Sequence, residues 1–190
     1  LDKDQQLAFS HTLGKVQPQG DGGIFKISID PKESPGAEYL KGSFFWHIDG
    51  ATDDVPNFAA TLSARTLSRT GGSTYFANTY AAYDDLPEED KQVYDQLRVV
   101  HSFEFVQRWV NPEPGSLELA FWQTRTPKVH PLVWKHASGR KSLVLGSTAE
   151  YVQDMDMAQG RALLTRLREW STQPQFVYRH DWQPGDLLIW

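Results

Sequence analysis

The chain of 190 residues contains no cysteine, and this absence narrows the chemistry open to it. Disulfide bonds, thiolate metal sites and cysteine nucleophiles are all excluded. Any bound metal must be held by histidine, carboxylate or water ligands, which favours Fe, Mn, Mg or Zn over ions that prefer sulfur. A chain without disulfides also fits the cytoplasm, and we expect the protein there.

Long apolar runs and an excess of positive charge are missing as well. No run is long enough to span a bilayer, so we expect no membrane-spanning segment. The net charge is −5 and the isoelectric point lies near 5.6, which argues against phosphate-driven binding to nucleic acid. With 39% hydrophobic and 23% charged residues, the composition is that of a globular protein.

The length suits a single domain with a sizeable core. The chain begins with Leu1 instead of methionine, and it stops on the apolar run from Leu187 to Trp190. We therefore expect residues 1–190 to be one domain that lacks its N- and C-terminal segments.

The pattern of apolar and turn-forming residues predicts many short strands and a few helices. Helices are expected over residues 2–13 and 87–98 and after a cap at Asp156. Strands are expected over residues 24–29, 44–48, 58–67 and 74–76, with hairpins over 129–145 and 176–190. Residues 103–127 have no clean period and are expected to form an irregular lid or binding loop. This order fits a mostly β fold, a double-sheet jelly roll with flanking helices.

One short motif, Trp46-His47-Ile48-Asp49-Gly50, suggests specific chemistry. Side chains two positions apart on an extended segment point to the same face, so His47 and Asp49 can hold one metal ion together. They would supply two ligands of the 2-His-1-carboxylate triad, which leaves open positions on non-haem Fe(II). Roughly one chain in three with six histidines has a His-x-Asp by chance. A hydrogen-bonded histidine beside a loop aspartate is therefore the alternative.

Three further segments accompany this motif in a fixed order. They are the glycine-rich segment Gly71-Gly72-Ser73-Thr74-Tyr75-Phe76, the pair His130-Pro131-Leu132-Val133 and Ser138-Gly139-Arg140, and the final run Trp182-Gln183-Pro184-Gly185-Asp186 with Leu187 to Trp190. With the His-x-Asp motif they resemble the taurine dioxygenase/2,4-dichlorophenoxyacetate dioxygenase superfamily over nearly the whole chain. The resemblance implies a double-stranded β-helix, or jelly roll. It also implies a dioxygenase that uses Fe(II) and 2-oxoglutarate to hydroxylate a small organic substrate, releasing succinate and CO2.

The resemblance also implies roles for individual residues. His47 and Asp49 match two of the family's iron ligands. Thr74 matches the threonine that binds the distal carboxylate of 2-oxoglutarate beside an arginine, and a hydroxyl with a guanidinium can satisfy a carboxylate. The second histidine ligand and that arginine are expected after Trp190.

The candidates within the chain for the third iron ligand are His11, His101, His130, His136 and His180. His180 lies on an expected strand near the end, but the family's distal histidine follows that strand by several residues. A paired strand residue is therefore the structural interpretation of His180. His130 precedes Pro131, and we expect it to shape the hairpin instead of binding metal.

The expected substrate site departs from that of the taurine enzymes. Where these have an Asp-Asn pair before the metal motif, this chain has Gly42 and Ser43. A sulfonate needs strongly donating partners to offset its desolvation, so taurine fits poorly. Ser43, Phe105 and Val144 are the candidate substrate contacts, and they favour a larger or less charged substrate.

Two other functions stay open from the sequence alone. One is a jelly-roll binding module without catalytic activity, and the other is a zinc hydrolase with a His/Asp/His site. For the dioxygenase, the expected partners are a small-molecule substrate and O2, with no nucleic acid and no membrane. A homo-oligomer is compatible with the sequence.

Overall fold

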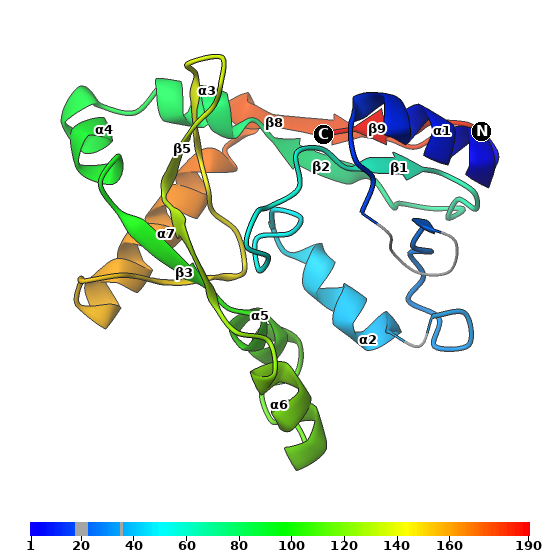
Figure 1. Ribbon diagram of the computed structural model, residues 1–190, viewed down its shortest axis with the longest axis horizontal. Helices are drawn as coiled ribbons and strands as arrows, with labels where there is room; N and C mark the ends of the chain where they lie inside the picture. The colour runs from blue at the N-terminus through cyan, green and yellow to red at the C-terminus, as the bar shows by residue number, and fades with distance from the viewer. Residues whose placement is uncertain (18–22, 35) are drawn as a thin grey trace. The chain divides into compact units, whose positions relative to one another are not determined.

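Figure 1 shows the computed structural model, which describes residues 1–17, 23–34 and 36–190. Over these ranges it has seven α-helices and nine strands, and the helices contain more residues than the strands do. The chain divides into two compact units. One comprises Leu1–Lys41, Phe58–Tyr75 and Arg179–Trp190, and the other comprises Gly42–Asn57 and Phe76–Tyr178. No helix in the described part of the chain is long and apolar enough to cross a membrane.

The first unit contains one small sheet, which pairs the last strand that the structure describes with the first. Strand β1 (Thr61–Ser63) pairs antiparallel with β9 (Leu187–Ile189), and the two lie side by side in Figure 1. Helix α1 (Lys3–Leu13) begins at an Asp2 capping box and holds β1 through polar contacts. The Ser63 hydroxyl donates to Gln6 Oε1 at 2.6 Å. The short helix α2 (Ala37–Leu40) belongs to the same unit.

The second unit contains a three-stranded antiparallel sheet and a hairpin. The sheet has the order β4-β3-β7, so β3 (Arg98–His101) lies between β4 (Lys128–Pro131) and β7 (Ala149–Val152). The hairpin pairs β5 (Val133–Lys135) with β6 (Lys141–Leu143). A further two-stranded sheet joins β2 (Thr74–Ala77) to β8 (Val177–His180).

The helical elements that follow β2 in the second unit are α3 (Thr79–Asp84), α4 (Glu88–Tyr94), α5 (Phe103–Val110), α6 (Ser116–Gln123), α7 (Met157–Ser171) and the 3₁₀ turn η3 (Pro174–Phe176). Of these, α3, α4, α7 and η3 contribute side chains to its core. Gly160 lets α7 approach β7 closely, because a Cβ at this position would lie 3.2 Å from the Val152 nitrogen. Leu164 and Leu167 of α7 are buried, and each such side chain contributes about 1.5–3 kcal/mol.

The core of the second unit is one cluster of buried apolar side chains from α3, α4, α7, the strands and the segments that join them. Its members are Ala82, Tyr83, Leu86, Tyr94, Val99, Leu132, Val133, Leu143, Leu145, Ala149, Val152, Leu164, Leu167 and Phe176. The cluster fixes the sheet and hairpin from which the residues around the candidate metal site project.

Several predicted elements are confirmed. Residues 3–13 form α1, and residues 74–77 form β2. Helix α7 starts at the predicted cap, where Asp156 Oδ1 accepts hydrogen bonds from two backbone nitrogens at 3.0 Å. The hairpin predicted over 129–145 is present but shorter, as β5 and β6, and its turn contains Gly139 at φ 85°. Residues 129–131 belong instead to β4, so His130 pairs with β3 and does not shape the hairpin.

Other predicted strands are wrong or shorter. Residues 24–29 form no strand, and residues 44–48 contain the end of a 3₁₀ helix, η2 (Lys41–Phe44), followed by a bend and residues without a ladder. The strand expected over 58–67 is reduced to β1, and the helix expected over 87–98 ends at Tyr94. Apolar alternation gives the extended conformation but not the neighbouring strand that a ladder requires.

The irregular loop expected over residues 103–127 is also wrong, because this stretch forms α5 and α6. Ser102 caps α5 by accepting from the Phe105 nitrogen at 3.1 Å, and Glu104 pairs with Arg108 one turn later at 2.7 Å. The predicted hairpin over 176–190 is wrong in its pairing, since β8 pairs with β2 and β9 pairs with β1. The sheets in the described residues are small and do not close into a barrel.

Candidate active site

The segment that carries His47 and Asp49 ends in a tight turn. Gly50 has φ 72°, in the left-handed region that favours glycine, and a Cβ there would lie 3.0 Å from the Asn57 nitrogen. The Asp53 nitrogen donates to the Gly50 carbonyl at 2.8 Å and closes the turn. The chain therefore turns directly after Asp49, which leaves this carboxylate at the start of the turn.

His47 and Asp49 face each other across one residue, as their spacing predicted. The Nε2 atom of His47 lies 3.4 Å from Asp49 Oδ1, and the two side chains are 37% and 32% exposed. The other ring nitrogen, Nδ1, lies 2.8 Å from the Phe45 carbonyl oxygen. A carbonyl can only accept, so Nδ1 carries the proton in the neutral ring and Nε2 keeps its lone pair for a metal.

The electrostatics of this pair favour a cation. The hydrogen bond to Asp49 raises the pKa of His47 above its ordinary value, against the lowering effect of burial. A site that stabilises a proton beside Nε2 also suits a metal ion. First-row ions bind nitrogen and oxygen at roughly 2.0–2.2 Å, so one ion can reach both atoms across a 3.4 Å gap. Among the described residues, no three His, Asp or Glu side chains gather closely enough to form a complete metal site.

Gly146 and Ser147, which follow strand β6, fix the start of residues 46–51. These residues carry the predicted metal ligands and are called the metal segment below. The Ser147 nitrogen donates to the Trp46 carbonyl at 2.7 Å. Gly146 has φ 131°, and a Cβ there would lie 2.9 Å from His47 Cα. Only a glycine lets this backbone approach so closely. No local pattern predicts this contact, because the two segments are about one hundred positions apart.

Thr74, the predicted 2-oxoglutarate residue, begins strand β2 and is partly buried. Its Oγ1 accepts a hydrogen bond from Trp182 Nε1 at 2.8 Å. An indole nitrogen can only donate, so the Thr74 hydroxyl proton stays free to point at an acceptor such as a carboxylate. Trp182 belongs to a segment that carries the family resemblance, but its contact with Thr74 was not predicted.

His180, the alternative third ligand, already has a partner. Its Nε2 lies 2.9 Å from Asp186 Oδ2, and its ring meets that of Trp182 edge-on at 4.7 Å. This geometry agrees with a paired strand residue. The His130 Nε2 likewise lies 3.1 Å from the Ala51 carbonyl oxygen inside the second unit. Neither imidazole is directed at a group of metal ligands in the described residues.

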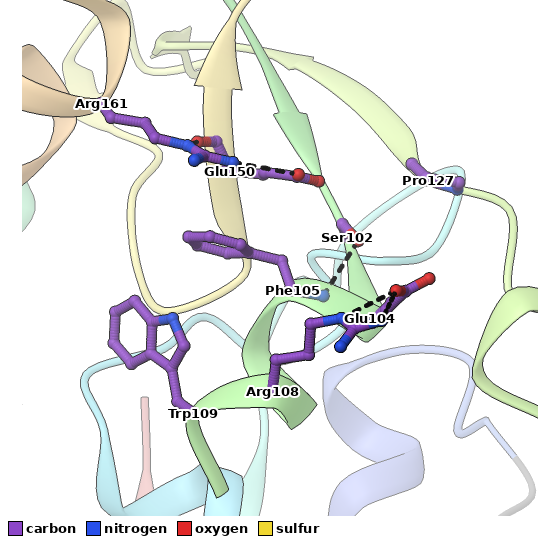
Figure 2. A pocket seen from close by; sticks show the side chains of 8 residues that line it. All are labelled: Ser102, Glu104, Phe105, Arg108, Trp109, Pro127, Glu150 and Arg161. Atoms are coloured by element: carbon purple, nitrogen blue, oxygen red, sulfur yellow. Dashed lines mark hydrogen bonds and ion pairs between the residues drawn. The ribbon is translucent and has the colours of Figure 1, made fainter. Parts of the chain in front are cut away.

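A cavity of about 440 Å³ lies beside α5 and β7 (Figure 2). Its lining residues are Ser102, Glu104, Phe105, Arg108, Trp109, Pro127, Glu150 and Arg161. Figure 2 shows the rings of Phe105 and Trp109 close together, with centroids 5.6 Å apart. Arg161 lies over the Phe105 ring at 5.4 Å and pairs with Glu150 at 3.4 Å. The cavity thus combines an aromatic wall with two paired arginines.

This cavity is connected to the metal segment through aromatic rings. The Phe45 ring meets the Trp109 ring edge-on at 5.1 Å, and the Phe45 carbonyl is the partner of His47 Nδ1. Of the predicted substrate contacts, Phe105 lines the cavity. Ser43 is exposed on η2 and Val144 is 1% exposed, and neither lines the cavity. Their contact with substrate stays a prediction.

Comparison with known proteins identifies related chains over the whole length. The family model described as "Taurine catabolism dioxygenase TauD, TfdA family" matches residues 1–190. The alpha-ketoglutarate-dependent 2,4-dichlorophenoxyacetate dioxygenase of Burkholderia sp. (strain RASC) is 35% identical, over 100% of this chain and 70% of that protein.

Two solved structures share both fold and sequence with the chain. A putative alpha-ketoglutarate-dependent 2,4-D dioxygenase from Burkholderia xenovorans is 32% identical with a TM-score of 0.83, over 100% of this chain and 68% of that one. AAD-2, in complex with Mn(II) and N-oxalylglycine, is 33% identical with a TM-score of 0.89, over 98% of this chain and 70% of that one. These matches give no support to a binding module without activity.

Proposed function

Because the chain belongs to the TauD/TfdA family of Fe(II)- and 2-oxoglutarate-dependent dioxygenases, we propose that His47 and Asp49 are its iron ligands. The observation that carries this assignment is the convergence of His47 Nε2 and Asp49 Oδ1 at 3.4 Å, with Nδ1 held by the Phe45 carbonyl. When bound, iron with 2-oxoglutarate supplies the activation of O2 that no side chain can provide.

The protein's own contribution is to orient these two ligands. The Phe45 carbonyl fixes the tautomer and the ring direction of His47, as backbone partners do for metal-binding histidines generally. The turn at Gly50 holds the Asp49 carboxylate on the same side. We propose that the second histidine of the triad lies outside residues 1–190, since His130 and His180 point at Ala51 and Asp186.

For 2-oxoglutarate, we propose that Thr74 donates a hydrogen bond to the distal carboxylate. The Trp182 indole occupies one lone pair of the Thr74 oxygen and thereby directs the hydroxyl proton away from itself. The arginine that the family places beside this threonine is proposed to lie outside residues 1–190 as well. The AAD-2 structure, a likeness over 98% of this chain, holds the dicarboxylate N-oxalylglycine.

We propose that residues 1–190 form one double-stranded β-helix domain with flanking helices. The strand pairs β1-β9 and β2-β8 join segments that are far apart in the chain, as that fold requires. The likeness to two related structures with TM-scores of 0.83 and 0.89 supports this proposal.

We propose that the substrate is a small organic acid with an aromatic body instead of taurine. The cavity wall of Phe105 and Trp109 suits an aromatic ring, and Arg108 and Arg161, each paired with a glutamate, supply guanidinium donors for a carboxylate. The relative named for 2,4-dichlorophenoxyacetate acts on a molecule of this kind.

Succinate formation by the full-length protein, with Fe(II), 2-oxoglutarate and O2, tests this assignment. Phenoxyacetate and taurine are compared as added substrates at equal concentration. We expect phenoxyacetate to raise the rate of succinate formation at least tenfold more than taurine, since a mismatched polar group weakens binding by about that factor. Stimulation by taurine above that by phenoxyacetate would overturn the substrate assignment. No succinate from 2-oxoglutarate with either compound would overturn the assignment of iron ligands and 2-oxoglutarate contact.

A further inference from the structure

The metal segment is anchored at both ends by contacts that lie outside it. At its start, the Trp46 carbonyl accepts from the Ser147 nitrogen at 2.7 Å. At its end, the Ala51 carbonyl faces His130 Nε2 at 3.1 Å. Residues 46–48 form no ladder of their own, so these anchors replace the hydrogen bonds that a strand would provide.

The two anchors are linked by a buried path behind the segment. Thr148, which follows Ser147, lies with its Oγ1 2.9 Å from His101 Nδ1. The His101 ring packs against the His130 ring with centroids 5.4 Å apart. His101 is 0% and His130 is 7% exposed, and both project from the β4-β3-β7 sheet. The path from Trp46 to Ala51 therefore runs through the buried imidazoles of His101 and His130 and the half-buried Thr148.

We propose that His130 is a positioning residue for the iron site, one that holds the Ala51 carbonyl and thereby fixes the turn that presents Asp49. This proposal rests on the assignment of His47 and Asp49 as iron ligands. Because a carbonyl only accepts, the His130 Nε2 atom is the donor, and the imidazole is held in a single tautomer. Strand β4 holds the backbone of His130 in place, since His130 is paired with Val99 in the β3–β4 ladder.

A second contact from β4 reaches the same loop but lies at the surface. Lys128, two residues before His130, pairs with Asp54 at 2.6 Å, and Asp54 is 88% exposed. An ion pair exposed to this degree contributes little to the geometry of the loop. The Ala51 carbonyl, in contrast, belongs to a residue that is 2% exposed, so losing its donor leaves a buried acceptor without a partner. His130 is therefore the contact that matters for the loop.

The test is a titration of the metal-free, full-length protein with Mn(II). Electron paramagnetic resonance measures the concentration of free Mn(II) at each step. We expect His130→Leu to raise the dissociation constant for Mn(II) about tenfold, the size of effect seen when the support of a metal ligand is removed. We expect His130→Gln, which retains an N–H donor of similar reach, to stay within about twofold of the parent protein.

His136→Leu is the matched control. His136 is half-buried and its Nε2 lies 2.8 Å from Ser142 Oγ in the β5–β6 hairpin, so its loss affects stability but not the metal segment. Its Mn(II) dissociation constant should equal that of the parent protein. If His130→Leu is not recovered folded, His130→Asn replaces it, because its amide is too short to reach Ala51 and should show the same loss.

Asp49→Ala, titrated in parallel, separates the two proposals. If Asp49→Ala loses Mn(II) binding while folded His130→Leu or His130→Asn binds like the parent protein, the positioning role is overturned and the iron assignment stands. If Asp49→Ala itself binds Mn(II) like the parent protein, both are overturned. Weakened binding in His130→Leu with retention in His130→Gln and His136→Leu supports the positioning role.

Discussion

At the scale of single residues, Thr74 shows how a hydroxyl is prepared for a carboxylate. The Trp182 indole donates to its oxygen at 2.8 Å and leaves the hydroxyl proton as the free donor. We expect Thr74→Val to raise the KM for 2-oxoglutarate about tenfold, because a hydrogen bond to a charged group contributes roughly 1.5–3 kcal/mol. Initial rates of succinate formation over a range of 2-oxoglutarate concentrations measure this effect.

Thr74→Ser is the control for that change, since it keeps the hydroxyl and loses only a methyl group. Its KM for 2-oxoglutarate should stay within about threefold of the parent protein, a factor equivalent to less than one hydrogen bond. An unchanged KM in Thr74→Val would show that this hydroxyl does not contact the cosubstrate.

Gly146 is the second residue whose identity the site depends on. A Cβ there would lie 2.9 Å from His47 Cα, and its φ of 131° is unfavourable for any other residue. We expect Gly146→Ala to lower the free energy of unfolding by about 2–4 kcal/mol, from backbone strain and overpacking together. Urea denaturation of the metal-free protein measures this loss.

The loop glycine Gly139 provides a matched control. It also has a positive φ, 85°, but a Cβ there would have no atom within 4 Å. Gly139→Ala should therefore cost only the backbone strain, about 1 kcal/mol. Equal losses in the two variants would contradict a close approach of residue 146 to the metal segment.

The sequence predicted that the side chains of His47 and Asp49 meet, but not what surrounds them. His47 and Asp49 are two positions apart, and local backbone geometry alone brings their side chains to one face. Trp182 contacts Thr74, and Gly146 lies against His47, in each case across roughly one hundred residues. No local sequence pattern predicts contacts at such a separation. Val144, a predicted substrate contact, is 1% exposed because apolar character alone does not distinguish a core residue from a pocket residue.

At the scale of elements, helices with clear caps were predicted and short strands were not. Asp156 caps α7, which begins where this predicted cap indicated. Helix α1 lies within the predicted range of 2–13, and the structure shows Asp2 as its cap. Helix α6 was missed because its apolar residues lie on several faces and hide the helical period. Helix α5 was missed although the apolar residues of its two turns recur at helical spacing. The Ser102 cap and the Glu104–Arg108 pair were present as signals in the sequence.

Strand β3 places an uncharged histidine at the centre of its sheet, and this sets a pH dependence. His101 is 0% exposed, and burial lowers its pKa to about 4, with a smaller lowering from His130. The folded pKa is below the unfolded value of 6.5, so the folded state binds fewer protons. Stability is therefore full above pH 6.5 and falls as the pH drops from there towards 4.

The size of this effect follows from the two pKa values. Between pH 7 and pH 5, protonation of His101 in the unfolded chain lowers the free energy of unfolding by roughly 2 kcal/mol. The variant His101→Asn keeps a polar partner for Thr148 but does not titrate in this range. Its free energy of unfolding should therefore fall by about 2 kcal/mol less than that of the parent protein between pH 7 and pH 5. Urea denaturation at both pH values measures the difference. His11→Asn, at an exposed position of α1, should lose as much as the parent protein.

The same pH-dependent loss in His101→Asn as in the parent protein would contradict a neutral, buried His101. It would also weaken the case for a rigid path behind the metal segment, because that path requires an imidazole that stays uncharged inside the sheet.

At the scale of the whole molecule, four ordered motifs predicted the reaction class, and the comparisons confirm it. The substrate was not predictable in the same way. The cavity is lined by residues of α5, β7 and α7 together with Ser102 and Pro127, and none of these belongs to one of the four motifs. Sheet pairing also escaped prediction, because β1-β9 and β2-β8 join segments over one hundred residues apart. Local patterns specify elements, whereas pairing depends on the packing of the whole chain.

The central claim is that His47 and Asp49 hold one metal ion between them. The most direct measurement is a Mn(II) titration of the full-length protein followed by electron paramagnetic resonance, with Asp49→Ala and Asp53→Ala as a pair. Asp53 is exposed in the same loop, so both variants remove one carboxylate and one negative charge from it. We expect one Mn(II) per chain for the parent protein and for Asp53→Ala, and binding weakened by a factor of about 100 or more for Asp49→Ala. Equal Mn(II) affinity in Asp49→Ala and Asp53→Ala would contradict it.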